Sequence, residues 1–367
     1  MYSLLRPLLF RLDAERAHTV SLAGARVVQA TALNAVRSMY AFDDTRLTQT
    51  LWGHTFPNPV GLAAGADKNA TLVPFWEAVG FGFVEVGSVS AQSCAGNPTP
   101  RAFRLPDDEA IINRMGLNND GAATIADRIA SRADDRSRPL GVNLAKTHDP
   151  DIMGDAAVDD FRASFRALAS HASYVVLNIS CPNTDDGKTF EAPDALDALL
   201  QGIRAEQNEG HGSDVPVLLK LSPPTSDQVV YDTQVEDVLT VAQMHDVDGI
   251  VATNTASDRK ALHTSDARLE SIGAGGLSGK PLAARATRLV RYVYRATNGG
   301  LPIIGVGGVH DADTAYAKIR AGASLVQLYT ALVYEGPGLV QRINEGLVDR
   351  LRRDGYDTIS DAVGADA

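Results

Sequence analysis

The stretch YVVLNISCPNT at Tyr174–Thr184 begins as an apolar run and ends as a polar loop. Its first four residues are apolar in succession, which is typical of a strand buried on both faces, as in a parallel sheet. Asn is a poor strand residue and Pro ends strand pairing, so the strand is predicted to stop near Asn178. The local loss of regularity around Cys181 marks a candidate site.

Seven other short runs share this apolar pattern, and segments with helical apolar spacing separate them. They are NPVGLAAG (58–65), FGFVEVGSV (81–89), PLGVNLA (139–145), VPVLLKLS (215–222), VDGIVATN (247–254), LPIIGVGG (301–308) and ASLVQLYTAL (323–332). Eight strand–helix units predict an α/β fold, a (β/α)8 TIM barrel over residues 57–355. A doubly wound open sheet is the alternative; the count of eight and the lack of G-x-G-x-x-G after the first strand favour the barrel.

The segments on either side of the barrel have different characters. Residues 1–56 are predicted to form two amphipathic helices, with Asp13 as a cap between them. These helices could close the bottom of the barrel, form a dimer contact, or lie on a membrane surface and admit a lipid-like molecule. Residues 356–367 are predicted to be a flexible tail.

Composition excludes several classes of protein. The net charge of −11 argues against a nucleic-acid partner, because phosphate contacts need basic patches. Residues 1–40 differ from the rest, with five Arg against one Asp and one Glu. No apolar run reaches the ~18 residues that span a bilayer, and the start does not resemble a signal peptide. Two cysteines, Cys94 and Cys181, fit a reducing compartment, and neither His nor carboxylate spacing predicts a metal site.

Polar residues and glycines follow all eight predicted strands. In a TIM barrel the carboxyl ends of the strands form the ligand site, so these residues are expected to converge. The polar side chains at the strand ends are Lys68, Ser88, Asn143, Asn178, Cys181, Asn183, Lys220, Thr253, Asn254 and Thr255. Amides, hydroxyls and two lysines suit a planar heterocycle that carries both donors and acceptors, although Lys220 could also reach outwards for structural reasons.

Glycines predict a phosphate site near the seventh and eighth strands. Gly276–Gly279, Gly305–Gly308 and Tyr329–Thr330 would bring backbone N–H groups together where barrels often bind phosphate, unless these glycines serve only as tight turns. Cys181 is a candidate acid–base group, since a thiol can remove a proton from a carbon acid held within reach. The alternative is a small buried apolar residue, and Cys94 has no such setting.

Several long motifs, in order, resemble the dihydroorotate dehydrogenase family, specifically its membrane-associated, quinone-reducing class. They include FRLDAERAH, NPVGLAAGADKN, GNPTPRAFRLP, INRMGLNN, NISCPNT, GGLSGKPL and GASLVQLYT, and the similarity covers nearly the whole chain. The resemblance implies oxidation of (S)-dihydroorotate to orotate in pyrimidine biosynthesis, with bound FMN and a membrane quinone as acceptor. It also implies that residues 1–56 form a quinone entrance on the cytoplasmic side of the cell membrane, as in a peripheral membrane protein.

The resemblance assigns ligand-binding residues motif by motif. FMN is expected to contact Ala64, Gly65, Ala66, Asp67, Lys68, Ser88, Asn143, Asn178, Lys220, Thr253, Gly279, Gly308, Tyr329 and Thr330. Orotate is expected to contact Lys68, Asn113, Arg114, Met115, Gly116, Leu117, Asn178, Asn183, Asn254 and Thr255. Cys181 would be the catalytic base, and no metal is implied.

The sequence departs from the quinone-reducing class in three places. Cysteine at position 181 is usual in the soluble class, which reduces fumarate or NAD, whereas the quinone class usually has serine. Asp185–Lys188 replaces an expected Gly-Leu-Arg, and Ser88 replaces threonine. Because a helical domain is harder to gain than one atom is to exchange, the front segment favours the quinone class. The alternatives are a soluble-type dehydrogenase, a flavin-binding barrel without activity, and a different phosphate-binding barrel.

Overall fold

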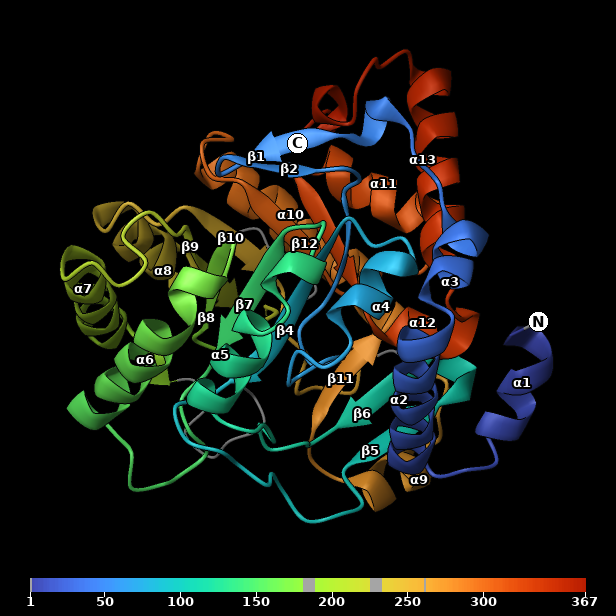
Figure 1. The fold of residues 1–367 in the computed structure, drawn as a ribbon. Coiled ribbons are helices and arrows are strands. Elements are labelled where there is room, and N and C mark those ends of the chain that lie inside the picture. Colours follow the sequence, from blue (N-terminus) through green and yellow to red (C-terminus); the bar gives the residue numbers. More distant parts are fainter. Residues whose placement is uncertain (1, 181–188, 225–232, 261) are drawn as a thin grey trace.

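The computed structural model describes residues 2–180, 189–224, 233–260 and 262–367 (Figure 1). Within these residues, eight parallel strands close into a barrel, in which neighbours follow chain order and the last strand pairs with the first. The predicted TIM barrel is therefore confirmed, and all eight predicted runs contain a barrel strand. The strands are β3 (Val60–Leu62), β4 (Phe83–Val89), β7 (Leu140–Leu144), β8 (Tyr174–Asn178), β9 (Val217–Leu221), β10 (Gly249–Ala252), β12 (Ile303–Val306) and β13 (Leu325–Leu328).

Helices surround the barrel and return the chain from the end of one strand to the start of the next (Figure 1). Parallel neighbouring strands need such crossover connections, because a short hairpin cannot join them. The helices that follow barrel strands are α4 (Val73–Ala78), α5 (Ala122–Ala130), α6 (Asp155–Leu168), α7 (Pro193–Asn208), α8 (Thr233–Met244), α9 (Asp266–Ile272), α10 (Ala283–Ala296), α11 (Ala312–Arg320), α12 (Thr330–Glu335) and α13 (Leu339–Asp354).

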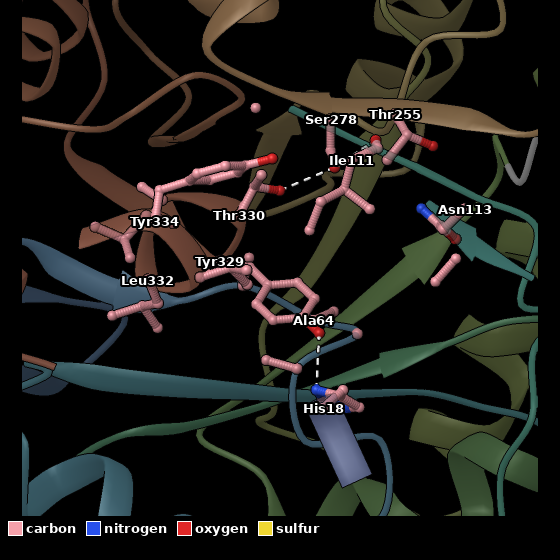
Figure 2. Close-up of a pocket in the computed structure, with 18 of the residues that line it drawn as sticks. His18, Ala64, Ile111, Asn113, Thr255, Ser278, Tyr329, Thr330, Leu332 and Tyr334 are labelled. Atoms are coloured by element: carbon pink, nitrogen blue, oxygen red, sulfur yellow. Dashed lines mark hydrogen bonds between the residues drawn. The ribbon is translucent and has the colours of Figure 1, made fainter. Parts of the chain in front are cut away.

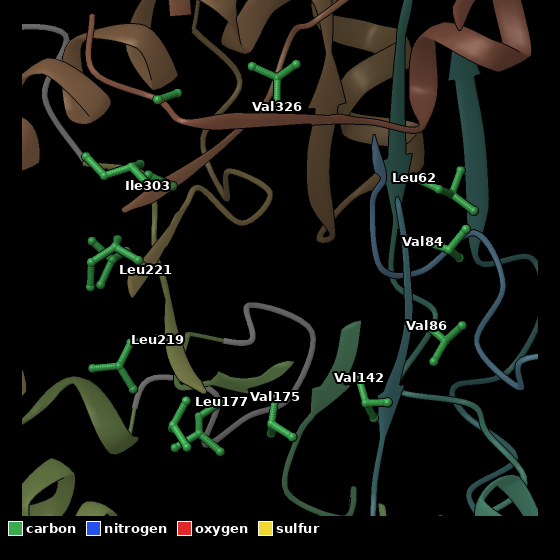
Figure 3. Close-up of a cluster of buried hydrophobic side chains, with 14 of the residues drawn as sticks. Leu62, Val84, Val86, Val142, Val175, Leu177, Leu219, Leu221, Ile303 and Val326 are labelled. Carbon is green, nitrogen blue, oxygen red and sulfur yellow. The ribbon is translucent and has the colours of Figure 1, made fainter. Parts of the chain in front are cut away.

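Side chains alternate between the two faces of each barrel strand. In β4, Val84 and Val86 belong to the apolar layer between barrel and helices, and Figure 3 shows them with their counterparts on the other strands. Phe83 lies in the separate cluster inside the barrel. Successive residues of a strand point to opposite faces, so Glu85 shares the interior face with Phe83. Both faces of these strands are buried, which explains their continuous apolar runs.

A hairpin closes the amino-terminal end of the barrel. It consists of β1 (Gln49–Leu51) and β2 (His54–Phe56). Phe56 is fully buried, and its ring meets that of Phe83 edge to face at 5.4 Å. The Trp52 indole N–H donates to the Asp248 carbonyl, 2.9 Å away and just before β10. The end of the segment predicted to be a helical domain is thus part of the barrel floor.

Three helices, rather than the two expected, precede the hairpin: α1 (Tyr2–Leu9), α2 (Ala14–Thr31) and α3 (Leu33–Tyr40). Asp13 caps α2 as predicted, because its carboxylate accepts from the backbone N–H groups of Glu15 and Arg16. The predicted second helix breaks at Ala32, and the chain turns so that Val36 packs against the apolar core.

A small antiparallel sheet lies at the other end of the barrel, beside α2 (Figure 1). Its strands are β5 (Ala102–Leu105), β6 (Ala110–Asn113) and β11 (Gly276–Gly279). β11 pairs with β6 across more than 160 residues of chain, which places Gly276 opposite Asn113. This sheet brings Asn113 and Gly279 to the same end of the molecule as the barrel strand ends.

The segment 356–367, predicted to be a flexible tail, is packed against the body of the protein. Ile359 is fully buried, and its N–H donates to the Arg46 carbonyl at 2.7 Å. Full burial of one isoleucine side chain stabilises by about 1.5–3 kcal/mol. The Asp366 carboxylate also forms an ion pair with Arg320 on α11. The structure differs from the prediction of a flexible tail, because burial of Ile359 and the ion pair of Asp366 hold the segment against the body of the protein.

Candidate active site

A cavity of about 420 Å³ opens at the carboxyl ends of the barrel strands. Its walls come from the strand ends, the small sheet and the inner faces of α1 and α2. Figure 2 shows side chains from α2, the small sheet and the region of the strand ends around it, including His18 from α2, Asn113 from β6 and Ser278 from β11; Tyr2 and Leu9 of α1 also line it. The cavity therefore extends from the barrel to the N-terminal helices, and chain segments far apart in sequence share it.

Asn178, at the end of β8, is central among the polar residues of the cavity. Its amide Nδ2 donates to the Ser88 hydroxyl at 3.0 Å, and its Oδ1 accepts from Asn254 Nδ2 at 3.1 Å. All three residues line the cavity. Residues far apart in the sequence, at the ends of three strands, thus form one hydrogen-bonded group. The predicted barrel implied that such residues would converge.

Lys68 supplies positive charge at the end of β3. Its Nζ donates to the Gly65 carbonyl at 2.9 Å. Burial, with a smaller contribution from the charge of Arg101, lowers the pKa of Lys68 to about 8. The ammonium form therefore predominates at neutral pH, and it can attract an anionic ligand in the cavity.

Two glycines shape a narrow part of the wall that suits a phosphate. Gly308 has φ +71°, and a Cβ there would lie 2.3 Å from the Ala283 nitrogen. Gly279 has φ +109°, and a Cβ there would lie 2.5 Å from the Glu109 carbonyl oxygen. Beside them, the Thr330 hydroxyl donates to the Ser278 hydroxyl at 2.9 Å (Figure 2). Only glycine fits these positions, which form the glycine cradle, because each lets its loop approach the backbone of Glu109 or Ala283 closely with φ in the left-handed region.

The comparisons with known proteins agree with this geometry. The family model described as "Dihydroorotate dehydrogenase" matches residues 46–351. The chain belongs to the dihydroorotate dehydrogenase family. Two relatives named "Dihydroorotate dehydrogenase (quinone)" illustrate the match. The Haloarcula marismortui protein is 45% identical over 100% of this chain and 99% of its own length, and the Chloroflexus aurantiacus protein is 46% identical over 94% and 95%.

A crystal structure of a family member from Eimeria tenella, in complex with ferulenol, has a closely similar fold. It aligns with a TM-score of 0.81 and 33% sequence identity, and the alignment covers 93% of this chain and 95% of that one. The high coverage includes more than the barrel. Both the predicted family and the predicted fold are therefore confirmed.

Most residues that the resemblance assigned do line the cavity. Those with atoms in its wall are Ala64, Gly65, Ala66, Lys68, Ser88, Asn113, Met115, Leu117, Asn178, Lys220, Thr253, Asn254, Thr255, Gly279, Gly308, Tyr329 and Thr330. Cys181 and Asn183 lie outside the described residues. Cys94 is half-buried, and its thiol contacts the Gly116 carbonyl.

Four assigned residues are not part of the cavity wall. The Asp67 carboxylate accepts from the backbone N–H groups of Thr71 and Leu72, so it shapes the loop after β3. The Arg114 guanidinium donates to two backbone carbonyls, those of Ile272 at the end of α9 and of Ala274 just after it. Gly116 and Asn143 complete the set; Asn143 is fully buried beneath the cavity, in contact with Ser88.

The N-terminal side of the cavity contains His18, which the sequence analysis did not single out, next to the predicted residue Tyr329. The His18 ring and the Tyr329 hydroxyl form a hydrogen bond of 3.3 Å (Figure 2). Burial, aided by the charge of Lys68, lowers the pKa of His18 to about 4, and burial raises the pKa of Tyr329 to about 12. Both are therefore neutral at physiological pH. His18 lies five residues after the helix cap Asp13, in the motif DAERAH. Its position in this motif did not indicate that its side chain would line the cavity.

Proposed function

We propose that this chain oxidises (S)-dihydroorotate to orotate in the biosynthesis of UMP, with bound FMN, and passes the electrons to a membrane quinone. The observation that carries the proposal is the continuous cavity, which joins the amide-rich strand ends, the glycine cradle and the apolar faces of α1 and α2. One end suits a pyrimidine, the middle suits a flavin, and the helical side suits an apolar oxidant. Family membership supports the same assignment.

The proposed FMN site divides into two parts. Gly279, Gly308, Tyr329 and Thr330 would hold the phosphate end, since all four line the cavity and Gly279 lies against Thr330. Ala64 to Ala66, Lys68, Ser88, Asn178, Lys220 and Thr253 would surround the ring, with Asn143 in support below. Bound FMN would supply the chemistry of hydride acceptance. The lysines would offset negative charge on the reduced ring.

The proposed substrate site combines residues of β6 and the loop after it with residues at the ends of β8 and β10. Asn113, Met115, Leu117, Asn178, Asn254 and Thr255 line the cavity there, and Lys68 would offset the carboxylate of orotate. Cys181 would take the proton from the carbon next to the one that loses hydride, so that two C–H bonds break and one C=C bond forms. Asn183 would also contact the substrate.

The visible spectrum of the purified protein tests this proposal. We expect a yellow protein with about one FMN per chain, which bleaches on addition of dihydroorotate without oxygen and recovers its colour with a soluble quinone analogue. Recovery with fumarate or NAD instead would identify a soluble-type acceptor. A yellow protein that dihydroorotate does not bleach would indicate a flavin-binding barrel without this activity. A colourless protein that does not take up FMN would overturn the proposal.

Attachment to a membrane surface through α1 is part of the proposal. Leu4 is 77% exposed, and Leu5 and Leu8 are also more than half exposed, although all three are large and apolar. The Arg-rich composition of residues 1–40 matches the negative charge of lipid headgroups. No helix among the described residues is long and apolar enough to cross a bilayer. We therefore propose peripheral attachment on the cytoplasmic side.

Cosedimentation with anionic lipid vesicles tests this attachment. We expect wild-type protein to bind, and the double variant Leu4→Glu/Leu8→Glu to bind at least tenfold more weakly, because each leucine contributes on the order of 1.5–3 kcal/mol when buried. Met244→Glu is the matched control, since Met244 on α8 is 70% exposed and remote from α1 in sequence. Equal binding of the double variant and this control would contradict the proposal; FMN content should remain unchanged in both.

A further inference from the structure

A buried carboxylate lies inside the barrel below the cavity. Glu85 on β4 is fully buried, and both of its oxygens accept hydrogen bonds. Oε1 accepts from Asn143 Nδ2 at 3.0 Å, while Oε2 accepts from Gln327 Nε2 at 2.6 Å and from the Tyr174 hydroxyl at 3.4 Å. Burial, together with the charge of Glu85, raises the pKa of Tyr174, which keeps that hydroxyl a donor. Three donors on two oxygens are the pattern of a carboxylate, not of a carboxylic acid.

A chain of side-chain hydrogen bonds runs from Glu85 to the cavity. Asn143 Oδ1 accepts from the Ser88 hydroxyl, whose oxygen accepts from Asn178 Nδ2. Asn178 Oδ1 in turn accepts from Asn254 Nδ2. Every donor in this chain therefore points back towards Glu85.

The direction of the chain depends on the group at its end. A hydroxyl can donate or accept, and an amide can rotate to exchange its oxygen and nitrogen, so by themselves Ser88, Asn143 and Asn178 could be arranged in either direction. The Asn254 amide is fixed separately, because it donates to the Ser180 carbonyl and accepts from the Thr255 N–H. A carboxylate only accepts. Glu85 thus requires Asn143 to turn its nitrogen towards Glu85 and its oxygen towards Ser88. The Ser88 hydroxyl must then donate to Asn143 and accept from Asn178 Nδ2.

This direction determines what the cavity offers to ligands. Asn178 Nδ2 has a second N–H beyond the one given to Ser88, so the amide presents a donor to the cavity. Asn254 Nδ2 also donates to the Ser180 carbonyl at 2.8 Å, and Asn254 Oδ1 accepts from the Thr255 N–H at 2.9 Å. Through Asn254, the series of side-chain hydrogen bonds is therefore also attached to the backbone just after β8.

The other carboxylate oxygen of Glu85 fixes the orientation of the Gln327 amide in the same way. Because its Nε2 donates to Glu85, its Oε1 must point elsewhere. Oε1 is buried and has no hydrogen-bond partner among the described residues, while Gln327 lines the cavity. A buried acceptor without a partner is costly, and an N–H of a bound planar ring would satisfy it.

We propose that Glu85 is a positioning residue, which orients the amide of Gln327 directly and that of Asn178 through Asn143 and Ser88, so that the cavity presents one fixed pattern of donors and acceptors to the ring and the pyrimidine. This inference rests on the proposed binding of FMN and orotate. Glu85 does not line the cavity, so its effect would be transmitted through the hydrogen-bond chain.

Glu85→Gln tests the role of direction with almost no change in shape. The introduced amide can accept from only one of its neighbours through oxygen, so either Asn143 or Gln327 must reverse. We expect the Kd for FMN, measured by quenching of FMN fluorescence on apo-protein, to rise about tenfold. The Kd for orotate, measured on the FMN-loaded protein by perturbation of the flavin spectrum, should rise by about the same factor.

Tyr174→Phe is the matched control, because it removes one donor to Glu85 and leaves the chain direction intact. Its two Kd values should stay within about threefold of wild type. Glu85→Gln/Asn143→Asp provides a rescue. The carboxylate introduced at position 143 can accept from position 85 and from Ser88, so the direction from Ser88 onward is restored. Orotate binding should return to within about threefold of wild type.

The outcomes separate this inference from the proposed function. If wild-type protein binds neither FMN nor orotate, the proposed function fails. If wild type binds both and Glu85→Gln binds them equally well, Glu85 has only a structural role and the inference is overturned. The inference also fails if the double variant binds orotate no better than the single one, or if circular dichroism shows that both are unfolded. Rescue by the double variant supports the inference even if the single variant is unfolded.

Discussion

Replacement of Cys181 by alanine is expected to slow the reduction of bound FMN by dihydroorotate by about 10²–10⁴-fold, the usual contribution of a general base. The flavin should remain bound, because the cradle and the strand-end amides are unchanged. Stopped-flow absorbance of the flavin under anaerobic conditions measures this rate directly. The other cysteine provides the control. Cys94 is half-buried, and in the Cys94→Ala variant dihydroorotate should reduce the bound FMN at close to the wild-type rate.

The pH dependence of the same rate distinguishes a thiol from a hydroxyl base. A base acts in its deprotonated form, so the rate rises with pH and levels off above the pKa of the base. An unperturbed thiol has a pKa of about 8.5, far below that of a serine hydroxyl. The wild-type rate should therefore level off at a lower pH than that of Cys181→Ser. Identical profiles would exclude Cys181 and make Ser180 the next candidate.

Gly308→Ala is expected to give protein that loses most of its FMN, with an affinity lower by on the order of 100-fold. A Cβ at this position would lie 2.3 Å and 2.4 Å from the nitrogen and Cα of Ala283, which are backbone atoms at the start of α10. The φ of +71° adds strain for any residue with a Cβ. The loop must move, and overpacking of this kind costs about 1–3 kcal/mol. Displacement of the loop removes the proposed phosphate cradle.

The ratio of flavin to protein absorbance and a thermal melt by circular dichroism measure the two effects of Gly308→Ala. Gly24→Ala is the control, because Gly24 lies in α2, has negative φ and has no neighbour within 4 Å of an added Cβ. This variant should retain FMN fully and have a slightly higher melting temperature, since alanine is more favourable than glycine within a helix by about 1 kcal/mol. Full FMN content in Gly308→Ala would contradict the proposed position of the phosphate.

The barrel could be predicted because its signal is local. Each strand is a short apolar run, each run is followed by a helical pattern, and the closed topology then brings the strand ends together. Asn178 and Asn254 were expected to meet for this reason, and they are hydrogen bonded. Glycines with positive φ, such as Gly308, were likewise recognisable in the pattern GVGG.

The parts that escaped prediction depend on non-local pairing or on hidden polar groups. The small sheet pairs β6 with β11, and no local pattern connects strands so distant in sequence. Glu85 and Gln327 lie within apolar runs, where a polar residue could have faced either side of the strand. Arg114 lies in a family motif but bonds to backbone carbonyls, so its motif position did not reveal its contacts.

The mixed origin of the cavity wall has an evolutionary consequence. The residues proposed for chemistry come from the barrel and the small sheet, whereas the side opposite them comes from α1 and α2. If α1 and α2 form the proposed entrance for the electron acceptor, mutations in residues 2–31 would reshape it without altering the strand-end amides. A lineage could therefore change its respiratory partner and preserve its pyrimidine chemistry, because separate stretches of the gene encode the two properties.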